Sequence, residues 1–345
     1  MNAGLTIAVD AMSGDHGAAE AVPAALDVLA QIPDLRLIIV GRGDVVRPLV
    51  AGADPGRCRV VEASEVVGMD EKPQEAVRRK KDSSMRVAVN LVKQGEAAAC
   101  VSAGNTGALL ATSRFVLGTV QGIDRPAIVS AVPAAHGHTV MLDLGANPDC
   151  SADHLVQFAV MGSVIASDLH GVDRPRIGLL NIGEEDIKGT EELKAAHRVL
   201  SAAPVHYVGF VEGNVIFSGD VDVVVTDGFT GNVALKTMEG LARFIGSVMR
   251  EEFTASPLRK VGALAASPAL NGIKSRLDPS AYNGASMVGL NGVVIKSHGS
   301  ADRKAFASAV RVAVTEARKG VPDQIVDLMA RVNASRQPSD GASAS

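Results

Sequence analysis

Short apolar runs recur along the chain, and most of them end in glycines and small polar residues. Runs of this kind cover residues 5–9, 35–40, 97–101, 176–180 and 221–225. Their length and flanking residues are typical of buried strands, whereas apolar positions in the segments between them have helical spacing. This alternation predicts an α/β fold with a doubly wound sheet. Right-handed crossovers would gather the turns after the strands along one edge of that sheet.

Two connections predict that the sheet is mixed rather than wholly parallel. The segment 133–138, PAAHGH, joins two apolar runs and is short enough for a hairpin. Asn291 and Gly292 divide the apolar segment 287–294 and form a dipeptide that suits a tight hairpin turn. We therefore expect antiparallel pairs within an otherwise parallel sheet.

The segment 100–115, CVSAGNTGALLATSRF, is a clear strand–turn–helix unit. Asn105 and Thr106 lie between two glycines, and Gly107 leads into the helix. Such a turn presents backbone N–H groups at a helix N-terminus, where the helix dipole favours an anion. An ordinary β–α turn capped by a polar residue has the same pattern, so this segment alone leaves both interpretations open.

Four further turns combine glycines with small polar residues after an apolar run. They are DLGAN (143–147), NIGEE (181–185), DGFTGN (227–232) and SHGS (297–300). Their neutral donors suit an oxyanion such as phosphate. The chain has no serine elbow, catalytic Cys–His signature or Walker lysine, and no GxGxxG fingerprint follows its first strand. From these residues we infer an α/β enzyme that handles a phosphate or an acyl phosphate.

Composition narrows the class of protein. The 345 residues suit one large α/β domain or two lobes, and the apolar fraction of 47% supports a substantial core. Aromatic residues make up only 3%, so the core must be built from Ala, Val, Leu and Ile, and base-stacking surfaces are disfavoured. A net charge of −4 provides no global attraction to nucleic acid or anionic lipid. We expect no nucleic-acid partner.

The cysteines and the absence of apolar targeting segments point to a soluble cytoplasmic protein. Cys58, Cys100 and Cys150 are odd in number and far apart, with neither a disulfide framework nor metal-ligand spacing. Cys150 follows a candidate site turn, but no basic partner is evident near it. No signal-peptide pattern opens the chain, and no apolar run approaches the ~20 residues that span a bilayer.

Two segments are candidates for interaction with a partner. Arg78, Arg79, Lys80 and Lys81 form a basic run, which is either a solvated face or a docking edge for an acidic protein or a phosphate. The segment 256–278 is amphipathic and basic. Its apolar positions include Leu258, Val261 and Leu264, and Pro268 and Gly272 are expected to divide it into two short helices. It can lie on a membrane surface, on a partner subunit or on its own core.

Several long motifs, in this order from about Leu5 to about Gly320, resemble the bacterial phosphate acyltransferase family of the PlsX type. They are AVDAMSGDHG, RRKKDSSM, VSAGNTGALLA, LDLGAN, LLNIGEEDIKG, VVVTDGFTGNVALK and GLNGVVIKSHGS. The resemblance implies a three-layer α/β/α fold like that of isocitrate and isopropylmalate dehydrogenases, with two intertwined lobes around one mixed sheet. It implies a single catalytic domain over 1–333 that includes the segment 256–278. The small polar residues 334–345 predict a disordered tail after that domain.

The same resemblance implies transfer of a fatty acyl group from acyl carrier protein to inorganic phosphate. The product, acyl phosphate, feeds glycerol-phosphate acylation in phospholipid synthesis. Members of the family form homodimers and contact the membrane peripherally, so a glycerol-phosphate acyltransferase is a further expected partner. The acidic carrier protein would dock on the run 78–81, and lipid contact becomes the favoured role of the segment 256–278. No cofactor or metal is expected.

Phosphate is a weak nucleophile that must be held in line with the thioester carbonyl, so positioning and oxyanion stabilisation should dominate catalysis. The expected catalytic residues are Lys188, His16 and Asn232. The residues expected to bind phosphate or substrate are Asn105, Thr106, Gly107, Asn147, Asp227, Gly228, Gly231 and His298. Asp10, Asp15, Asp143 and Asp227 are expected to orient donors rather than to bind a metal.

Some of these assignments have plain alternatives. Lys188 could be a surface lysine paired with Glu184 or Glu185. The sequence also departs from the family pattern at Ser13, where glycine is usual, and at Val215, where a polar or acidic residue is common. Two other classes stay open: a metal-dependent decarboxylating dehydrogenase on the same fold, and a non-catalytic scaffold on the membrane surface.

Overall fold

The computed structural model describes residues 4–277 and 283–336. Its centre is an 11-stranded mixed sheet with the strand order β3-β2-β1-β4-β11-β10-β5-β6-β9-β7-β8. The strands are β1 (Leu5–Asp10), β2 (Leu35–Gly41), β3 (Cys58–Glu62), β4 (Ala99–Ser102), β5 (Ala127–Pro133), β6 (His138–Leu142), β7 (Ile177–Leu180), β8 (Tyr207–Val211), β9 (Val223–Val225), β10 (Ala285–Val288) and β11 (Val293–Lys296).

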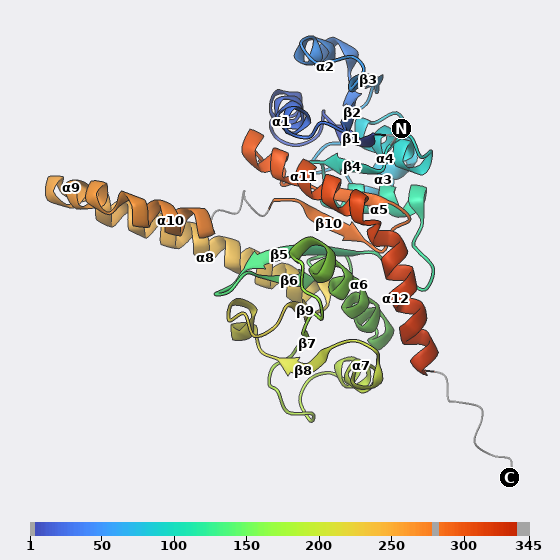
Figure 1. The fold of residues 1–345 in the computed structure, drawn as a ribbon, viewed down its shortest axis with the longest axis vertical. Coiled ribbons are helices and arrows are strands. Elements are labelled where there is room, and N and C mark those ends of the chain that lie inside the picture. Colours follow the sequence, from blue (N-terminus) through green and yellow to red (C-terminus); the bar gives the residue numbers. More distant parts are fainter. Residues whose placement is uncertain (1–3, 278–282, 337–345) are drawn as a thin grey trace, which may run out of the picture.

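Helices cover both faces of the sheet, as the α/β prediction requires (Figure 1). They are α1 (Ala18–Gln31), α2 (Gly43–Val50), α3 (Pro73–Arg79), α4 (Ser84–Lys93), α5 (Thr106–Leu117), α6 (Ala152–His170), α7 (Glu191–Ala202), η1 (Gly213–Phe217), α8 (Gly228–Thr254), α9 (Pro257–Ala265), α10 (Ser267–Leu277), α11 (Arg303–Lys319) and α12 (Val321–Arg336).

The core alternates between the two faces because successive strand residues point to opposite sides. Val101 and Ile295 pack with α1 and α11, and Val129 packs with α6 and α12 on the same face. Cys100 and Val294 point the other way, into a cluster formed with α4, α5, η1 and the first turns of α8. The first face thus has two clusters, one in each half of the sheet, whereas the single cluster on the opposite face runs beneath both halves. Aliphatic residues dominate all three clusters, as the composition predicted.

Strand directions correct one expectation. The strands β3-β2-β1-β4-β11 are parallel, and so are β6-β9-β7-β8. Between these groups, the pairs β11–β10, β10–β5 and β5–β6 are antiparallel. Three reversals make the two parallel groups run in opposite directions, so their turns do not gather along one edge. The hairpins themselves, β5–β6 and β10–β11, are those that the sequence predicted.

The helices α8, α9 and α10 form an arm that projects from the body of the molecule (Figure 1). The α8 helix has 27 residues, which corresponds to about 40 Å at 1.5 Å per residue. The expected division of the segment 256–278 is present, but it falls at Ala266. Pro268 lies in the first turn of α10, where its missing N–H costs no helical hydrogen bond, and Gly272 lies within that helix. Among the described residues, no helix is long and apolar enough to cross a membrane.

The end of the chain also differs from expectation. The α12 helix continues through Arg336, so residues 334–336 are helical rather than part of a disordered tail. Val332 is fully buried two residues before the predicted start of that tail, and this packing holds the last turn in place. The remainder of the predicted tail lies outside the described residues.

Candidate active site

The turns after β1, β4 and β11 form one group, because these strands are adjacent and parallel. Asp10 at the end of β1 is fully buried and accepts a hydrogen bond from Ser102 Oγ over 2.6 Å. Ser102 Oγ in turn accepts the N–H of Gly104 over 3.1 Å. The N–H of Asp15 donates to the carbonyl of Gly299 over 2.8 Å. Hydrogen bonds thus tie three turns together; we call them the first turn group.

Asn105 caps α5 within this group. Its Oδ1 accepts the N–H of Ala108 over 3.0 Å, and its Nδ2 donates to the carbonyls of Met69 (2.7 Å) and Glu71 (3.1 Å). The side chain therefore holds the preceding loop against the start of the helix. The N–H groups of Thr106 and Gly107 belong to the first helical turn and have no intrahelical partner. An oxyanion can therefore bind at this helix end through backbone donors, while the predicted direct role of Asn105 stays a prediction.

Lys296, which the sequence analysis did not single out, is the most unusual charge in the first turn group. It is the last residue of β11, and only 8% of it is exposed. Its Nζ donates to the carbonyl oxygens of Ser297 and Ala103, the latter over 3.5 Å. Burial and the charge of Lys236 lower the pKa of Lys296 to about 8, although Asp10 opposes the shift. The sequence did contain a signal for this site residue: a lysine at the end of an apolar run, directly before the motif SHGS.

His298 follows in the same turn and is exposed. Ser300 donates its N–H to His298 Nδ1 over 3.2 Å, so the neutral ring carries its hydrogen on Nε2. Burial of part of the ring and the charge of Lys296 lower the pKa of His298. The ring is therefore neutral at pH 7 and can donate from Nε2. His16 lies in the turn after β1 with its side chain exposed, and its catalytic role stays a prediction.

The turn after β6 contributes the first residues of a second turn group. Asp143 is fully buried. It accepts the N–H groups of Ile128 (2.9 Å), Ala146 (3.1 Å) and Asn147 (2.7 Å). Asn147 Nδ2 donates both to Asp143 (2.9 Å) and to the carbonyl of Pro126 (2.8 Å). Burial raises the pKa of Asp143 against these hydrogen bonds. As expected for Asp143, the carboxylate orients donors; the carboxamide of Asn147 is likewise engaged within the turn.

The start of α8 completes the second turn group. Asp227 caps the helix, because its Oδ1 accepts the N–H of Thr230 over 2.8 Å. A Cβ on Gly231 would overlap the carbonyl oxygen of Asp143, and one on Gly228 would lie 2.7 Å from the carbonyl oxygen of Asn147. Both glycines therefore allow the two turns to approach closely. The sequence analysis predicts that both glycines bind phosphate or substrate. The close approach of the two turns is a second, structural reason for glycine at these positions.

Solvent reaches two polar residues of this neighbourhood that were predicted to be catalytic, Asn232 and Lys188. Asn232 lies beside Gly145 and is exposed to solvent. Lys188 belongs to the turn after β7, which neighbours β9 in the sheet. Its Nζ lies 3.0 Å from Glu185 Oε2, so the alternative ion pair is present, and 42% of the lysine side chain is exposed. An exposed pair of this kind contributes little stability, and Lys188 can exchange Glu185 for an anion.

The α8 helix connects the two turn groups across the sheet. Asn232 lies in its first turns, and Lys236 and Glu239 follow on the next two. Lys236 Nζ lies 3.0 Å from Glu239 Oε2, and both residues act electrostatically on His298 in the first turn group. From Asn232 to Glu239 the helix rises about 10 Å. Groups from opposite strand ends therefore face a common region beside α8.

The thiols are not activated for nucleophilic catalysis. Burial raises the pKa of Cys150 to about 11 and raises that of Cys58 and, further, of Cys100. Cys150 Sγ lies 3.4 Å from the carbonyl oxygen of Asn147, to which its S–H can donate. These cysteines are therefore protonated at pH 7, whereas the thiolate is the nucleophilic form.

The basic run before α4 is divided by the fold. Arg78 and Arg79 end α3 and are exposed, as is Lys81. Lys80 instead donates from Nζ to the carbonyl of Val66 over 3.0 Å and is partly buried. Three of the four predicted docking cations thus face solvent, and the fourth fastens a loop.

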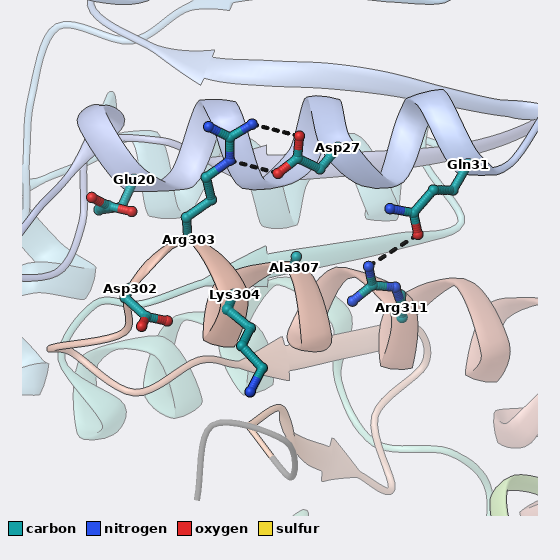
Figure 2. Close-up of a pocket in the computed structure, with 8 residues that line it drawn as sticks. All are labelled: Glu20, Asp27, Gln31, Asp302, Arg303, Lys304, Ala307 and Arg311. Atoms are coloured by element: carbon teal, nitrogen blue, oxygen red, sulfur yellow. Dashed lines mark hydrogen bonds and ion pairs between the residues drawn. The ribbon is translucent and has the colours of Figure 1, made fainter. Parts of the chain in front are cut away.

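A hollow of about 440 Å³ lies between α1 and α11 (Figure 2). Arg303 and Asp27 face each other across it and form two hydrogen bonds of 2.5 Å. Arg311 donates to Gln31 over 3.0 Å. The hollow is open to solvent, and these pairs use the groups that could hold a ligand. Its lining includes Glu20 and Asp302, which follow the turns after β1 and β11 of the first turn group.

Comparison with known proteins assigns the sequence to a family. Residues 5–324 match the family model described as "Fatty acid synthesis protein". The chain is 57% identical over 334 residues to the phosphate acyltransferase of Methylococcus capsulatus, covering 96% of this chain and 98% of that protein. It is also 57% identical over 324 residues to the phosphate acyltransferase of Nitrosococcus oceani, covering 93% and 95% of the two chains.

Solved structures share the fold at low sequence identity. A phosphotransacetylase from Streptococcus pyogenes has a TM-score of 0.62 at 16% identity, covering 92% of this chain and 95% of that chain. A 4-hydroxythreonine-4-phosphate dehydrogenase from Klebsiella pneumoniae has a TM-score of 0.50 at 15% identity, covering 91% and 99% of the chains. The expected three-layer fold, common to acyltransferases and dehydrogenases, is confirmed.

Proposed function

The chain belongs to the phosphate acyltransferase family and is an acyltransferase enzyme; on this premise we propose that it transfers a fatty acyl group from acyl carrier protein to inorganic phosphate. The products are the free carrier thiol and an acyl phosphate for phospholipid synthesis. The supporting observation is the α8 helix, which carries Asn232 beside the second turn group and, one and two turns further on, Lys236 and Glu239, whose charges act on His298. The family match also removes the support for a dehydrogenase.

The reaction needs positioning more than acid–base chemistry. A phosphate oxygen attacks the thioester carbonyl carbon, and the carbonyl oxygen becomes an oxyanion. Collapse of this tetrahedral intermediate breaks the C–S bond and releases a thiolate, which is stable enough to leave without a general acid. Preorganised donors stabilise the oxyanion at low reorganisation cost, so no covalent enzyme intermediate is required.

We assign the nucleophile to the first turn group and the developing charge to the second. The N–H groups of Thr106 and Gly107 and the Nε2–H of His298 are suited to phosphate. Asn232 is suited to the carbonyl oxygen, and Lys188 to either anion once it leaves Glu185. This division uses the exposed donors and leaves the fully bonded carboxylate of Asp143 as support.

The decisive experiment is thiol release from a purified palmitoyl-carrier protein, with and without inorganic phosphate. We expect release that depends on phosphate, with the acyl phosphate trapped as a hydroxamate by hydroxylamine. The control for phosphate-independent thioester hydrolysis is wild-type protein assayed without phosphate. No release above that control, from folded protein, would contradict the proposal and favour a scaffold on the membrane surface.

We further propose that the arm serves a homodimer and a membrane surface in the cytoplasm. Phe244 and Val248 of α8 are exposed, as are Leu258, Val261 and Leu264 of α9, which are 81%, 65% and 76% exposed. Burial of such side chains provides the favourable free energy for association. A second copy would cover α8, and lipid would cover α9, near the glycerol-phosphate acyltransferase that consumes the product.

Liposome flotation tests the membrane part of this proposal. Replacing Leu258 and Leu264 by glutamate should abolish flotation while leaving thiol release from a soluble carrier unchanged, because the substitutions lie outside the turn groups. Light scattering on the same variant checks the dimer. Flotation equal to wild type would exclude lipid contact through α9.

A further inference from the structure

An exposed aromatic side chain lies over a cation on the surface formed by α4 and α5. Phe115 is 68% exposed, and no other large apolar side chain of α4 or α5 is exposed to this degree. The Arg86 guanidinium lies 4.9 Å from the centre of its ring. Nε and Nη1 of Arg86 are buried, and within the described ranges they have no hydrogen-bond partner. The pair thus combines apolar surface with incompletely satisfied positive charge.

The surrounding residues add positive charge to this pair. Arg79 ends α3, and the connection to α4 is tight, because Ser83 Oγ donates to the carbonyl of Lys80 over 2.8 Å and accepts the N–H of Arg86. Arg86 therefore lies close to the end of α3. We define the α3–α5 surface by its exposed cations and this pair: Arg78, Arg79, Lys81, Arg86, Arg114 and Phe115.

Two acidic residues of the same segment, Glu75 and Asp82, are also exposed and offset part of this positive charge. Asp82 accepts hydrogen bonds from the N–H and the hydroxyl of Ser64, over 2.9 and 2.5 Å, and is thereby directed toward the neighbouring loop. These bonds hold the pKa of Asp82 below its ordinary value, so the carboxylate is charged at neutral pH. The five cations of the α3–α5 surface outnumber these two carboxylates, so the surface keeps a net positive charge that can attract an acidic partner.

The α3–α5 surface is next to the first turn group. Pro73, the first residue of α3, packs so closely on α5 that a Cβ on Gly107 would lie 2.9 Å from Pro73 Cγ. From Pro73 to Arg79, α3 rises about 9 Å. Asn105 joins the same region through its hydrogen bonds to the loop before α3. A partner bound on the surface could therefore present a flexible, acyl-bearing arm to the turn.

We propose that the α3–α5 surface docks the acidic protein that carries the acyl thioester, with Phe115 as the apolar anchor. Arg86 fixes the ring from beneath, while Arg78, Arg79 and Lys81 attract the partner's carboxylates. Aromatic and arginine side chains supply much of the energy at protein interfaces, and surrounding charges raise the rate of association. The identity of the partner rests on the proposed function; the surface itself is defined by charge and exposure.

Binding of purified acyl carrier protein, followed by fluorescence anisotropy, tests the docking surface without requiring turnover. Phe115→Ala should raise Kd about tenfold, and Arg78→Glu with Arg79→Glu should raise it at least as much at low salt. High salt should shrink the charge effect but leave the Phe115 effect. Matched controls are Leu49→Ala on α2 and Arg198→Glu on α7, both exposed and remote, which should leave Kd unchanged.

Kinetics separate docking from the chemical step. Phe115→Ala should raise KM for the carrier-bound acyl group about tenfold, while kcat and the KM for phosphate stay at the wild-type values. Unchanged Kd in both surface variants would overturn the docking proposal, as would an equal loss in Leu49→Ala and Arg198→Glu. Wild-type protein that binds carrier through this surface but releases no thiol would instead contradict the proposed function alone. Equal melting temperatures establish that each variant is folded.

Discussion

The two turn groups use buried charge in different ways. In the second group the buried ion is the carboxylate of Asp143, which accepts several hydrogen bonds, and Asn147 completes the same network. In the first group the buried carboxylate of Asp10 is accompanied by a buried cation, Lys296, whose ammonium donates to two carbonyl oxygens and whose pKa is lowered to about 8. The comparison indicates that the second group is a rigid frame, whereas the charge of the first changes within a few units of neutral pH.

The largest effect on activity is expected at Asn232, whose exposed side chain lies beside the second turn group. Asn232→Ala should lower kcat by about 10²–10³ if Asn232 stabilises the oxyanion, with little change in stability. Asn147→Ala should instead act on stability. It should lower the free energy of unfolding by about 1–3 kcal/mol, because buried hydrogen-bond partners are left unsatisfied. Steady-state rates and urea unfolding of both variants test this contrast. Loss of stability in Asn232→Ala and not in Asn147→Ala would reverse it.

The next effect tests the close approach of the turns within the second group. Gly231→Ala should lower the free energy of unfolding by about 2–3 kcal/mol, because its Cβ would overlap the carbonyl oxygen of Asp143. Gly240→Ala is the matched control on the same helix, where nothing lies within 4 Å of the added Cβ. It should be neutral or slightly stabilising. Equal stability of the two variants would show that the turns can separate.

A smaller effect is expected at the ion pair beside the second group. Lys188→Met should lower kcat/KM about 10- to 100-fold if the ammonium binds an anion in the reaction, whereas Glu185→Gln should change stability by less than about 0.5 kcal/mol. Rates over a series of phosphate concentrations, with unfolding curves, distinguish these outcomes. Wild-type kinetics in Lys188→Met would leave Lys188 as half of a surface pair.

The smallest effect is a pH dependence that belongs to the first group. Lys296 has a pKa of about 8 in the folded chain against 10.5 ordinarily, so between these values the unfolded chain binds more protons. The free energy of unfolding should therefore rise with pH across this window, and Lys296→Met should remove that rise. Unfolding at pH 7 and pH 10 measures it. The KM for phosphate should also rise above pH 8 in wild type, as positive charge is lost, and stay flatter in the variant.

Much of the secondary structure of this protein could be predicted from short patterns in the sequence. Strands, glycine turns and both hairpins follow from patterns a few residues long, because backbone preference acts over that range. The motifs also indicated the family. Phosphate sites were placed in glycine turns on the same local grounds, and those turns are where the exposed donors lie.

Only the tertiary structure decided which turns face one another and which charges are buried. Three antiparallel pairings reverse the second half of the sheet, and α8 then brings Lys236 and Glu239 toward His298. Burial set the altered pKa of Lys296, directed Lys80 to Val66, and made Asn105 a loop anchor. These properties depend on residues distant in the chain, because burial and long-range contacts arise only when the whole sheet has assembled.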